Sequence, residues 1–339
     1  MRIQVNARNQ GFEFEARGRE SVLYAGLRAG VDLPYECATG TCGTCKAKLI
    51  SGRLRDGWRE APGRKYVKPE QAEFLMCQCA AETDVTLQVS KFINAADPGA
   101  CAPVACQGVL RGARLLTHDV MAFGIELERA CDFEAGQFMV LAAPGVAGYR
   151  GYSMINFERS ARRVDFVVKK KPGGAFSEWL FSAPREGATL SVFGPLGKAT
   201  FYPALASNLL CIAGGSGIAG MMSILARAAQ ERHFERYRGW VFFGVRTMRD
   251  AFFLQELSTH AAKVKVTIAL SDEPVPETAR RDWPALAFAH GLVHEVARNK
   301  YENVRAYVAG PPPAVDAALR MLLLEAKLTS DNIRYDKYS

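Results

Sequence analysis

The sequence predicts a multidomain chain with an α+β part, a β part and an α/β part, on three observations. A cysteine-rich loop lies near the N-terminus, over residues 37–45. From Gln107, short strand-like segments alternate with turn residues, as in a small antiparallel barrel. From Leu209, apolar strands alternate with helical stretches, which is the pattern of a doubly wound parallel sheet. At 339 residues the chain is also too long for one ordinary core.

We expect the three parts to follow one another along the chain, with one short linker. Residues 2–5 and 12–15 are expected to pair as a hairpin. Ser21 can cap a helix that ends before Gly30. Asp97-Pro98-Gly99 indicates the linker, because it holds turn residues and little apolar pattern. The expected limits are 1–94 for a small α+β domain of β-grasp shape, 95–105 for the linker, 106–203 for the barrel domain and 204–339 for the α/β domain.

The N-terminal loop carries the strongest chemical signal in the chain. Three cysteines have the spacing C-x4-C-x2-C and two more follow far downstream: Cys37, Cys42, Cys45, Cys77 and Cys79. This is the spacing of a plant-type [2Fe-2S] site, in which four thiolates converge on two irons. Gly40 and Gly43 allow the tight loop that such convergence needs. A zinc ribbon would more usually have two C-x2-C pairs, and disulfides are not expected without a secretory signal.

Composition and charge limit the function classes. The net charge is +8, but the basic residues are scattered and do not form a stripe, so we expect no nucleic-acid partner. The longest uncharged run, 199–226, is interrupted by the glycines of 214–217, which favours a buried strand, turn and helix over a membrane span. The N-terminus does not resemble a signal peptide, and we expect a cytoplasmic protein.

The expected barrel carries two motifs of chemistry-bearing residues. One is Arg150-Gly151-Tyr152-Ser153, on a strand, where the arginine can pair with a phosphate and the tyrosine can stack on a ring. The other runs from Lys169 to Ser177, where glycines precede a helix expected over 177–181 whose N-terminal N–H groups suit a pyrophosphate. Together these motifs predict a flavin site. Its candidate residues are Arg150, Gly151, Tyr152, Ser153, Val168, Lys169, Gly174, Ala175, Phe176 and Ser177.

Two glycine turns in the α/β part predict a nicotinamide-nucleotide site, because they let a dinucleotide backbone approach closely. The candidate turn residues are Gly214, Gly215, Ser216, Gly217, Gly310, Pro311 and Pro312. Asp250 could accept a hydrogen bond from a ribose hydroxyl and would repel a 2′-phosphate, which favours NADH. Arg246 and Arg249 leave NADPH possible. His118-Asp119 is interpreted as a barrel turn, since hydride transfer needs no acid–base pair there.

With these motifs in this order, the chain resembles the reductase components of bacterial multicomponent oxygenases over essentially its whole length. The resemblance implies a plant-type ferredoxin domain, an FAD domain and an NAD(P)H domain. It selects Cys77 as the fourth cluster ligand, because the family reads L-x-C-Q there. It places Ser153 near the reactive edge of the flavin and makes Tyr338 the aromatic residue that covers the flavin ring. The chain departs from many relatives at Gly220, where they have proline, and at Ala309, where they have cysteine.

The resemblance implies an electron path from NADH through FAD and the [2Fe-2S] cluster to a terminal oxygenase or a Rieske-type ferredoxin. Because hydride transfer delivers two electrons and the cluster accepts one, a flavin must stand between them. We expect a monomer with no membrane association. One alternative is a biosynthetic reductase that serves a deoxysugar dehydratase. Another is a binding module without cofactors, which would be colourless when purified.

Overall fold

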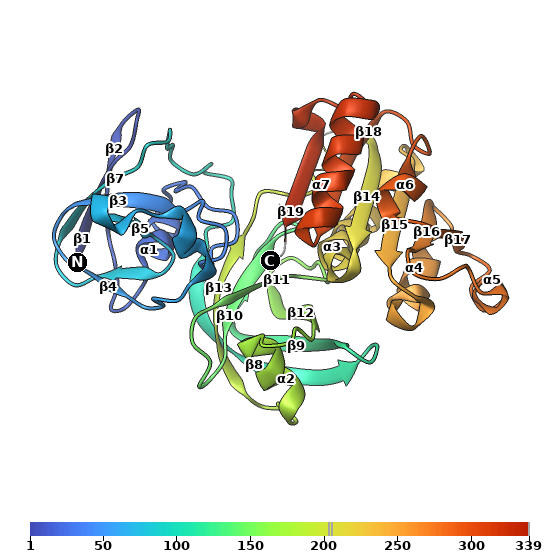
Figure 1. The fold of residues 1–339 in the computed structure, drawn as a ribbon, viewed down its shortest axis with the longest axis horizontal. Coiled ribbons are helices and arrows are strands. Elements are labelled where there is room, and N and C mark those ends of the chain that lie inside the picture. Colours follow the sequence, from blue (N-terminus) through green and yellow to red (C-terminus); the bar gives the residue numbers. More distant parts are fainter. Residues whose placement is uncertain (203, 205, 338–339) are drawn as a thin grey trace. The chain divides into compact units, whose positions relative to one another are not determined.

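The computed structural model describes residues 1–202, 204 and 206–337 (Figure 1). The chain divides into two compact units, each described by itself below. The first unit comprises Met1–Gly108, Met139–Gly151 and Thr189–Leu196, and the second unit comprises Val109–Phe138, Tyr152–Ala188 and Gly197–Ser339.

The N-terminal part of the first unit is a β-grasp. Its elements are β1 (Arg2–Asn6), β2 (Gly11–Glu15), α1 (Val22–Arg28), β3 (Lys46–Ser51), β4 (Leu54–Asp56), β5 (Glu73–Leu75), β6 (Cys79–Ala81) and β7 (Val85–Gln88). The main sheet has the order β2-β1-β7-β3-β5, in which only β1 and β7 are parallel. The expected hairpin is confirmed, with Asn6 paired to Gly11. Figure 1 shows α1 lying against this sheet.

Helix α1 forms where its capping residues predict it. Ser21 is the N-cap, and its Oγ accepts a hydrogen bond from the backbone N–H of Tyr24 at 3.3 Å. Gly30 ends the helix with φ +76°, a conformation that favours glycine. Six of the seven helical residues are buried, so the helix supplies one side of the core of this part.

The middle of the chain forms one six-stranded sheet of order β11-β10-β13-β8-β9-β12. Strands β10 (Phe138–Ala142) and β13 (Thr189–Leu196) fall largely in the first unit, and β11 (Arg150–Ser153) is divided between the two units after Gly151. Strands β8 (Val104–Leu115), β9 (Val120–Cys131) and β12 (Ala161–Lys169) fall largely in the second. Within the second unit, β9 and β12 pair antiparallel along nearly their whole length. This is the antiparallel barrel part that the sequence predicts.

The expected helix over 177–181 begins earlier than predicted. Helix α2 spans Ala175–Ser182, with Gly174 as an N-cap in an extended conformation. Ser177 therefore lies inside the first turn and does not open the helix. Its Oγ accepts from the N–H of Lys171 at 3.0 Å and lies 2.9 Å from the carbonyl oxygen of Gly174, so it ties the preceding turn to the helix.

The C-terminal part of the second unit is a doubly wound parallel domain. Its strands are β14 (Asn208–Gly214), β15 (Gly239–Val245), β16 (Val264–Leu270), β17 (Ala287–His290), β18 (Val304–Gly310) and β19 (Ile333–Lys337). Its helices are α3 (Ile218–Gln230), α4 (Leu254–His260), α5 (Glu277–Asp282), α6 (Val293–Ala297) and α7 (Pro312–Arg320). The strand order is β17-β16-β15-β14-β18-β19. The order reverses between β14 and β18, and the crevice at such a switch point is where doubly wound sheets bind ligands.

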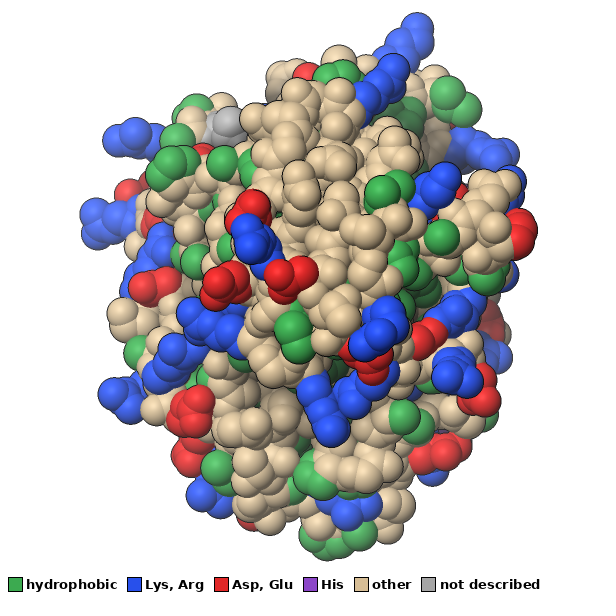
Figure 2. Space-filling model, turned by 90° about the vertical axis from the view of Figure 1, so that its left-hand side faces the viewer, with side chains coloured by type: hydrophobic (Ala, Val, Ile, Leu, Met, Phe, Trp, Pro, Cys, Tyr) green, Lys and Arg blue, Asp and Glu red, His purple; other side chains and the backbone are tan. Residues whose placement is uncertain are grey.

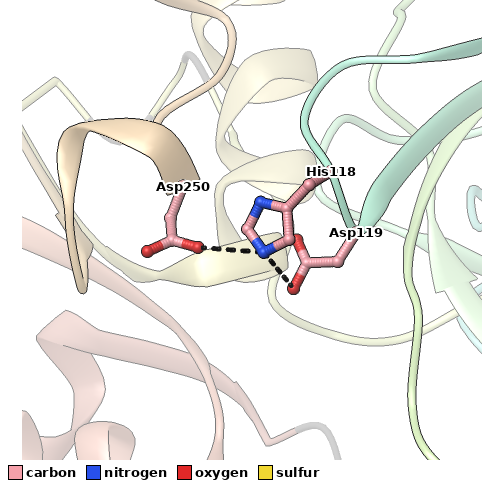
Figure 3. Close-up of side chains that lie close together, drawn as sticks. All are labelled: His118, Asp119 and Asp250. Atoms are coloured by element: carbon pink, nitrogen blue, oxygen red, sulfur yellow. Dashed lines mark ion pairs between the residues drawn. The ribbon is translucent and has the colours of Figure 1, made fainter.

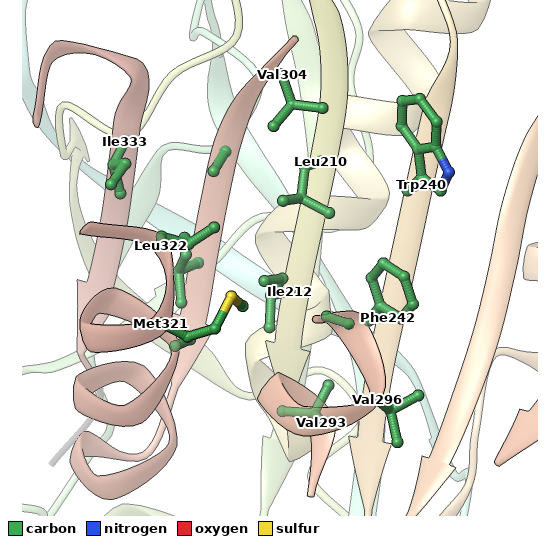
Figure 4. Close-up of a cluster of buried hydrophobic side chains, with 14 of the residues drawn as sticks. Leu210, Ile212, Trp240, Phe242, Val293, Val296, Val304, Met321, Leu322 and Ile333 are labelled. Atoms are coloured by element: carbon green, nitrogen blue, oxygen red, sulfur yellow. The ribbon is translucent and has the colours of Figure 1, made fainter. Parts of the chain in front are cut away.

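A cluster of buried hydrophobic side chains covers one face of this sheet (Figure 4). On one face, Leu210 and Ile212 of β14 and Phe242 of β15 pack against Val293 of α6 and Leu322, which follows α7. Successive strand residues alternate between faces, so the residues between these point to the other face, where α3 packs on β14 and β18. The sheet thereby fixes the ends of β14 and β18.

Two further observations concern the described residues as a whole. Among them, no helix is both long and apolar enough to cross a membrane. Lys and Arg side chains are interspersed with Asp and Glu on the face that Figure 2 shows, and they form no continuous basic stripe there.

Candidate functional site

The cysteine loop brings the predicted sulfur atoms together. The Sγ atoms of Cys45 and Cys77 lie 3.2 Å apart, although the two residues are distant in sequence. The backbone N–H groups of Thr39 and Thr41 both donate to Cys37 Sγ at 3.4 Å. Such donors stabilise negative charge on sulfur, as a thiolate ligand requires.

Further donors complete the sulfur environment. The N–H of Thr44 donates to Cys42 Sγ at 3.5 Å, and Gln78 Nε2 donates to Cys77 Sγ at 3.4 Å. A hydrogen bond from Cys42, together with hydrogen bonds from Thr41 and Thr39, lowers the pKa of Cys37 to about 4 although burial opposes the shift. Because the sulfur atoms are already paired and surrounded by donors, this loop fits a [2Fe-2S] cluster.

Close approach of the backbone explains the glycines of the loop. Gly40 and Gly43 have φ of +85° and +77°, which side chains rarely adopt. Gly63 donates its N–H to the carbonyl of Gly40 at 2.7 Å, and a Cβ on Gly63 would lie only 2.7 Å from that oxygen. The segment around Gly63 therefore packs directly on the loop.

Cys79 differs from the other four cysteines. It lies in β6 and is 3% exposed, and burial raises its pKa to about 11. A hydrogen bond to Cys45 and burial also raise the pKa of Cys77, so burial alone does not separate these two cysteines.

The first flavin motif lies on β11. The Arg150 guanidinium stands over the Trp58 ring, 4.6 Å from its centroid, and donates to the carbonyl of Tyr149 at 2.9 Å. Gly151 and Tyr152 are half-buried, and Ser153 is 4% exposed.

The two flavin motifs meet within the second unit. The Tyr152 ring lies 5.1 Å from the ring of Phe176, which belongs to the first turn of α2 beside Ala175. Gly174 has no room for a side chain, since a Cβ would lie 2.8 Å from Ser177 Oγ and 2.9 Å from the carbonyl oxygen of Lys171. The backbone at Gly174 cannot carry a side chain, and it lies at a helix N-terminus next to an aromatic pair. This arrangement fits a dinucleotide phosphate.

Val168 and Lys169, the last residues of β12, have different environments. Val168 is buried. Lys169 Nζ lies 2.6 Å from Asp119 Oδ2, so an ion pair holds its ammonium group just before the glycine turn at Gly173-Gly174.

The two nucleotide turns lie in contact at the switch point. A Cβ on Gly217 would lie 2.3 Å from the carbonyl oxygen of Ala309 and 2.7 Å from the N of Gly310. Gly310 itself has φ +147°, and Pro311 and Pro312 follow it as the N-cap and first residue of α7. Both turns thus expose backbone at the carboxyl ends of β14 and β18. Four residues make up the first turn: Gly214, Gly215, Ser216 and Gly217.

A small cavity in the second unit lies beside Gly220 of α3 and Ala309 of β18, which are next to the two nucleotide turns in sequence. Its lining includes Gly136, Ala199, Gly220, Tyr307, Ala309 and Asp336. A Cβ on Gly220 would lie 3.7 Å from Ser153 Oγ. Gly220 and Ala309, the two positions singled out by the resemblance, therefore line the same cavity. Tyr338, the predicted ring-covering aromatic, lies outside the described residues.

Asp250 has two structural contacts that its sequence position did not indicate (Figure 3). Its Oδ2 accepts from the N–H and Oγ1 of Thr247 at 3.0 and 2.8 Å, which forms a capping box. Its Oδ1 lies 3.9 Å from His118 Nε2, which is 3.7 Å from Asp119 Oδ2. Arg246 pairs with Asp272 at 2.8 Å on the surface.

The comparisons with known families follow the same order as the three parts. Residues 5–82 match the 2Fe-2S iron-sulfur cluster binding domain, 107–201 the oxidoreductase FAD-binding domain and 211–320 the oxidoreductase NAD-binding domain. The chain is 33% identical to the ferredoxin–NAD(P)+ reductase CarAd of Metapseudomonas resinovorans, covering 94% of each chain. It is also 33% identical to the ferredoxin–NAD(+) reductase component of the alkene monooxygenase system of Xanthobacter autotrophicus, covering 97% of this chain and 99% of the relative.

The chain belongs to the ferredoxin–NAD(P)+ reductase components of oxygenase systems. A solved structure described as the ferredoxin reductase in carbazole 1,9a-dioxygenase has a TM-score of 0.85 at 30% identity and covers 100% of this chain and 99% of its own. The reductase is an NADH-dependent iron–sulfur flavoprotein with [2Fe-2S], FAD and NADH as cofactors, and it transfers electrons within an oxygenase system. The relatives fit this function and do not support a deoxysugar dehydratase as the partner.

Proposed function

We propose that Cys37, Cys42, Cys45 and Cys77 are the four ligands of the cluster. The observation that carries this assignment is the 3.2 Å separation of Cys45 Sγ and Cys77 Sγ, together with the N–H donors to Cys37. Cys77 is preferred to Cys79 as the fourth ligand in this proposal, because its Sγ lies beside that of Cys45 whereas Cys79 lies in β6.

The remaining site residues hold the two nucleotides. Arg150 and the backbone N–H groups at the start of α2 bind the FAD phosphates, and Ser153 lies at the reactive edge of the ring. The turns at Gly214–Gly217 and Gly310 accept the NADH backbone, and Tyr338 covers the flavin. When bound, FAD converts the hydride of NADH into single electrons that the cluster passes on. The chain's own task is to orient these groups and to exclude water from the cavity beside Ser153.

The proposed electron acceptor is a terminal oxygenase or a Rieske-type ferredoxin. Relatives are named for carbazole, alkene, xylene and phenol oxygenase systems, so we infer an aromatic or other hydrocarbon as the substrate of the whole system. The reductase itself never contacts that substrate. In this proposal it acts as a monomer in the cytoplasm.

The test is anaerobic purification followed by chemical analysis and reconstitution. We expect two irons, two acid-labile sulfides and one FAD per chain, and substrate oxidation when NADH and a candidate oxygenase component are added. A higher kcat/KM for NADPH than for NADH would contradict the proposed nucleotide. Zinc in place of iron, or a protein without labile sulfide, would overturn the ligand assignment.

A further inference from the structure

Tyr24 connects the cysteine loop to strands of the barrel, within the first unit. It lies in α1 and is 5% exposed. Its hydroxyl donates to the carbonyl of Ala38 at 3.0 Å. Ala38 directly follows Cys37 and has φ +56°, an unusual conformation for alanine. The hydrogen bond therefore holds the loop at the point where its backbone is most constrained.

The ring of Tyr24 contacts the barrel strands. It stacks on Phe193 of β13 with ring centroids 4.2 Å apart and planes 14° apart. It also meets the edge of Tyr149 at 5.5 Å and 83°. Tyr149 immediately precedes Arg150, the first residue of the flavin motif on β11. One side chain thus touches the cysteine loop with its hydroxyl, and touches β13 and the residue before β11 with its ring.

A second contact joins the same two parts. The Arg150 guanidinium lies over Trp58, and a Cβ on Gly148 would lie 3.5 Å from that indole. The residue before Trp58, Gly57, donates its N–H to the carbonyl of Gln78 at 2.8 Å. Gln78 follows Cys77, so this contact also leads back to a cysteine. The part of the first unit that carries the cysteines therefore contacts the barrel strands of that unit at two places.

We propose that Tyr24 is a positioning residue for electron transfer from FAD to the cluster. Within the first unit it fixes the loop that holds Cys37 against β13 and the residue before Arg150, and so holds the cluster ligands next to the part of the flavin motif that belongs to this unit. One electron leaves the reduced flavin and one ferric iron becomes ferrous, while Tyr24 is neither oxidised nor deprotonated. This inference rests on the proposed cluster and FAD assignments.

The experiment compares Tyr24→Phe, Tyr24→Leu and Phe193→Leu with the wild type. Tyr301→Phe is the matched control, because it removes a tyrosine hydroxyl that contacts Met321 Sδ at 3.1 Å in the second unit, remote from the loop in sequence. Two activities distinguish reduction of the flavin by NADH from electron transfer to the cluster. NADH–ferricyanide reduction needs only the flavin, whereas NADH–cytochrome c reduction also needs the cluster.

We expect Tyr24→Leu and Phe193→Leu to lower cytochrome c reduction about tenfold and to leave ferricyanide reduction within about twofold of wild type, because each removes ring contacts that hold the two parts together. Tyr24→Phe keeps the ring contacts but loses the hydrogen bond to Ala38, so it should lower cytochrome c reduction by a smaller factor than the two leucine variants.

Amide hydrogen exchange supplies a readout that is independent of activity. Tyr24→Phe should speed exchange over residues 38–41 about fivefold, because the hydrogen bond to Ala38 is lost. Phe193→Leu should leave exchange there unchanged, since Phe193 supports the ring and not the hydroxyl.

The outcomes are distinguishable. If the wild type reduces ferricyanide but not cytochrome c, the cluster assignment fails. If the wild type reduces both and both leucine variants match it in cytochrome c reduction, the role of Tyr24 is refuted. An equal loss of both activities in Tyr24→Leu and Phe193→Leu would also refute it, because it would show damage to the whole protein.

Discussion

Replacing Gly217 with alanine tests the contact between the two nucleotide turns. A Cβ at this position would lie 2.3 and 2.5 Å from the carbonyl oxygen and carbon of Ala309, and 2.7 Å from the N of Gly310. All three are backbone atoms, so the turn itself would have to move. The φ of Gly217 is −59°, which alanine adopts readily, so the obstacle is space and not conformation.

The expected change in the free energy of unfolding follows from two opposing contributions. Overpacking of this kind costs about 1–3 kcal/mol, and the helix preference of alanine over glycine returns at most about 1 kcal/mol. We expect a net loss of about 1–2 kcal/mol in the free energy of unfolding. Displacing backbone donors from a phosphate should raise the KM for NADH about tenfold, since a hydrogen bond to a charged group contributes about 1.5–3 kcal/mol.

Gly220→Ala is the matched comparison, because it makes the same change in the first turn of α3. Its Cβ would lie 3.6 Å from Ser153 Cβ and 3.7 Å from the carbonyl oxygen of Gly136, which is ordinary contact. We expect this variant to be more stable than wild type by up to about 1 kcal/mol. Calorimetry and steady-state NADH–ferricyanide kinetics measure both effects. A Gly217→Ala variant with wild-type stability and KM would refute the reasoning.

Three further predictions concern other parts of the chain. Cys77→Ser should lose iron and labile sulfide whereas Cys79→Ser retains both, and equal loss in the two variants would contradict the ligand assignment. Arg227→Met should lower the free energy of unfolding in urea by about 2–3 kcal/mol, because this 6% exposed arginine pairs with a half-buried carboxylate; an unchanged midpoint would show that the pair contributes nothing. Burial raises the pKa of Asp119, but the ion pair with Lys169 lowers it by more, so the net shift of this pKa is downward. The stabilisation is therefore present above the unfolded pKa of about 4 and lost below it, so Asp119→Asn should differ from wild type in thermal stability at pH 7 and converge with it in acid.

The parts of the fold with a strong local signal could be predicted from sequence. The strand, turn and helix expected around the glycines of 214–217 are observed, with the helix over Ile218–Gln230, because the glycine turn marks its start. The start of α2 was wrong by two residues, since Gly174 caps the helix through its backbone and leaves no capping side chain to recognise. Strands β17 and β19 were missed because they are short sheet-edge strands with polar residues among the apolar ones. The domain limits stay a prediction.

The candidate site was predictable from sequence where the spacing of residues along the chain indicates their chemical role. Cysteine spacing and glycine turns are local patterns, so the sequence indicates them directly. Tyr24 was not predictable, because an aromatic residue on a buried helix is usually core, and its partner Phe193 lies far along the chain. Ser223 was also missed. Its Oγ accepts from the N–H of Gly136 at 2.8 Å, and a buried serine in an apolar helix was the available signal.

The capping box at Asp250 has a consequence for anyone who redesigns coenzyme preference. The usual route replaces the acidic residue after the second strand with a neutral or basic one. Here that carboxylate also accepts two hydrogen bonds from Thr247. The substitution would therefore remove a cap worth about 1 kcal/mol and loosen the turn that presents the new side chain. A library that varies Thr247 together with Asp250 is the better starting point.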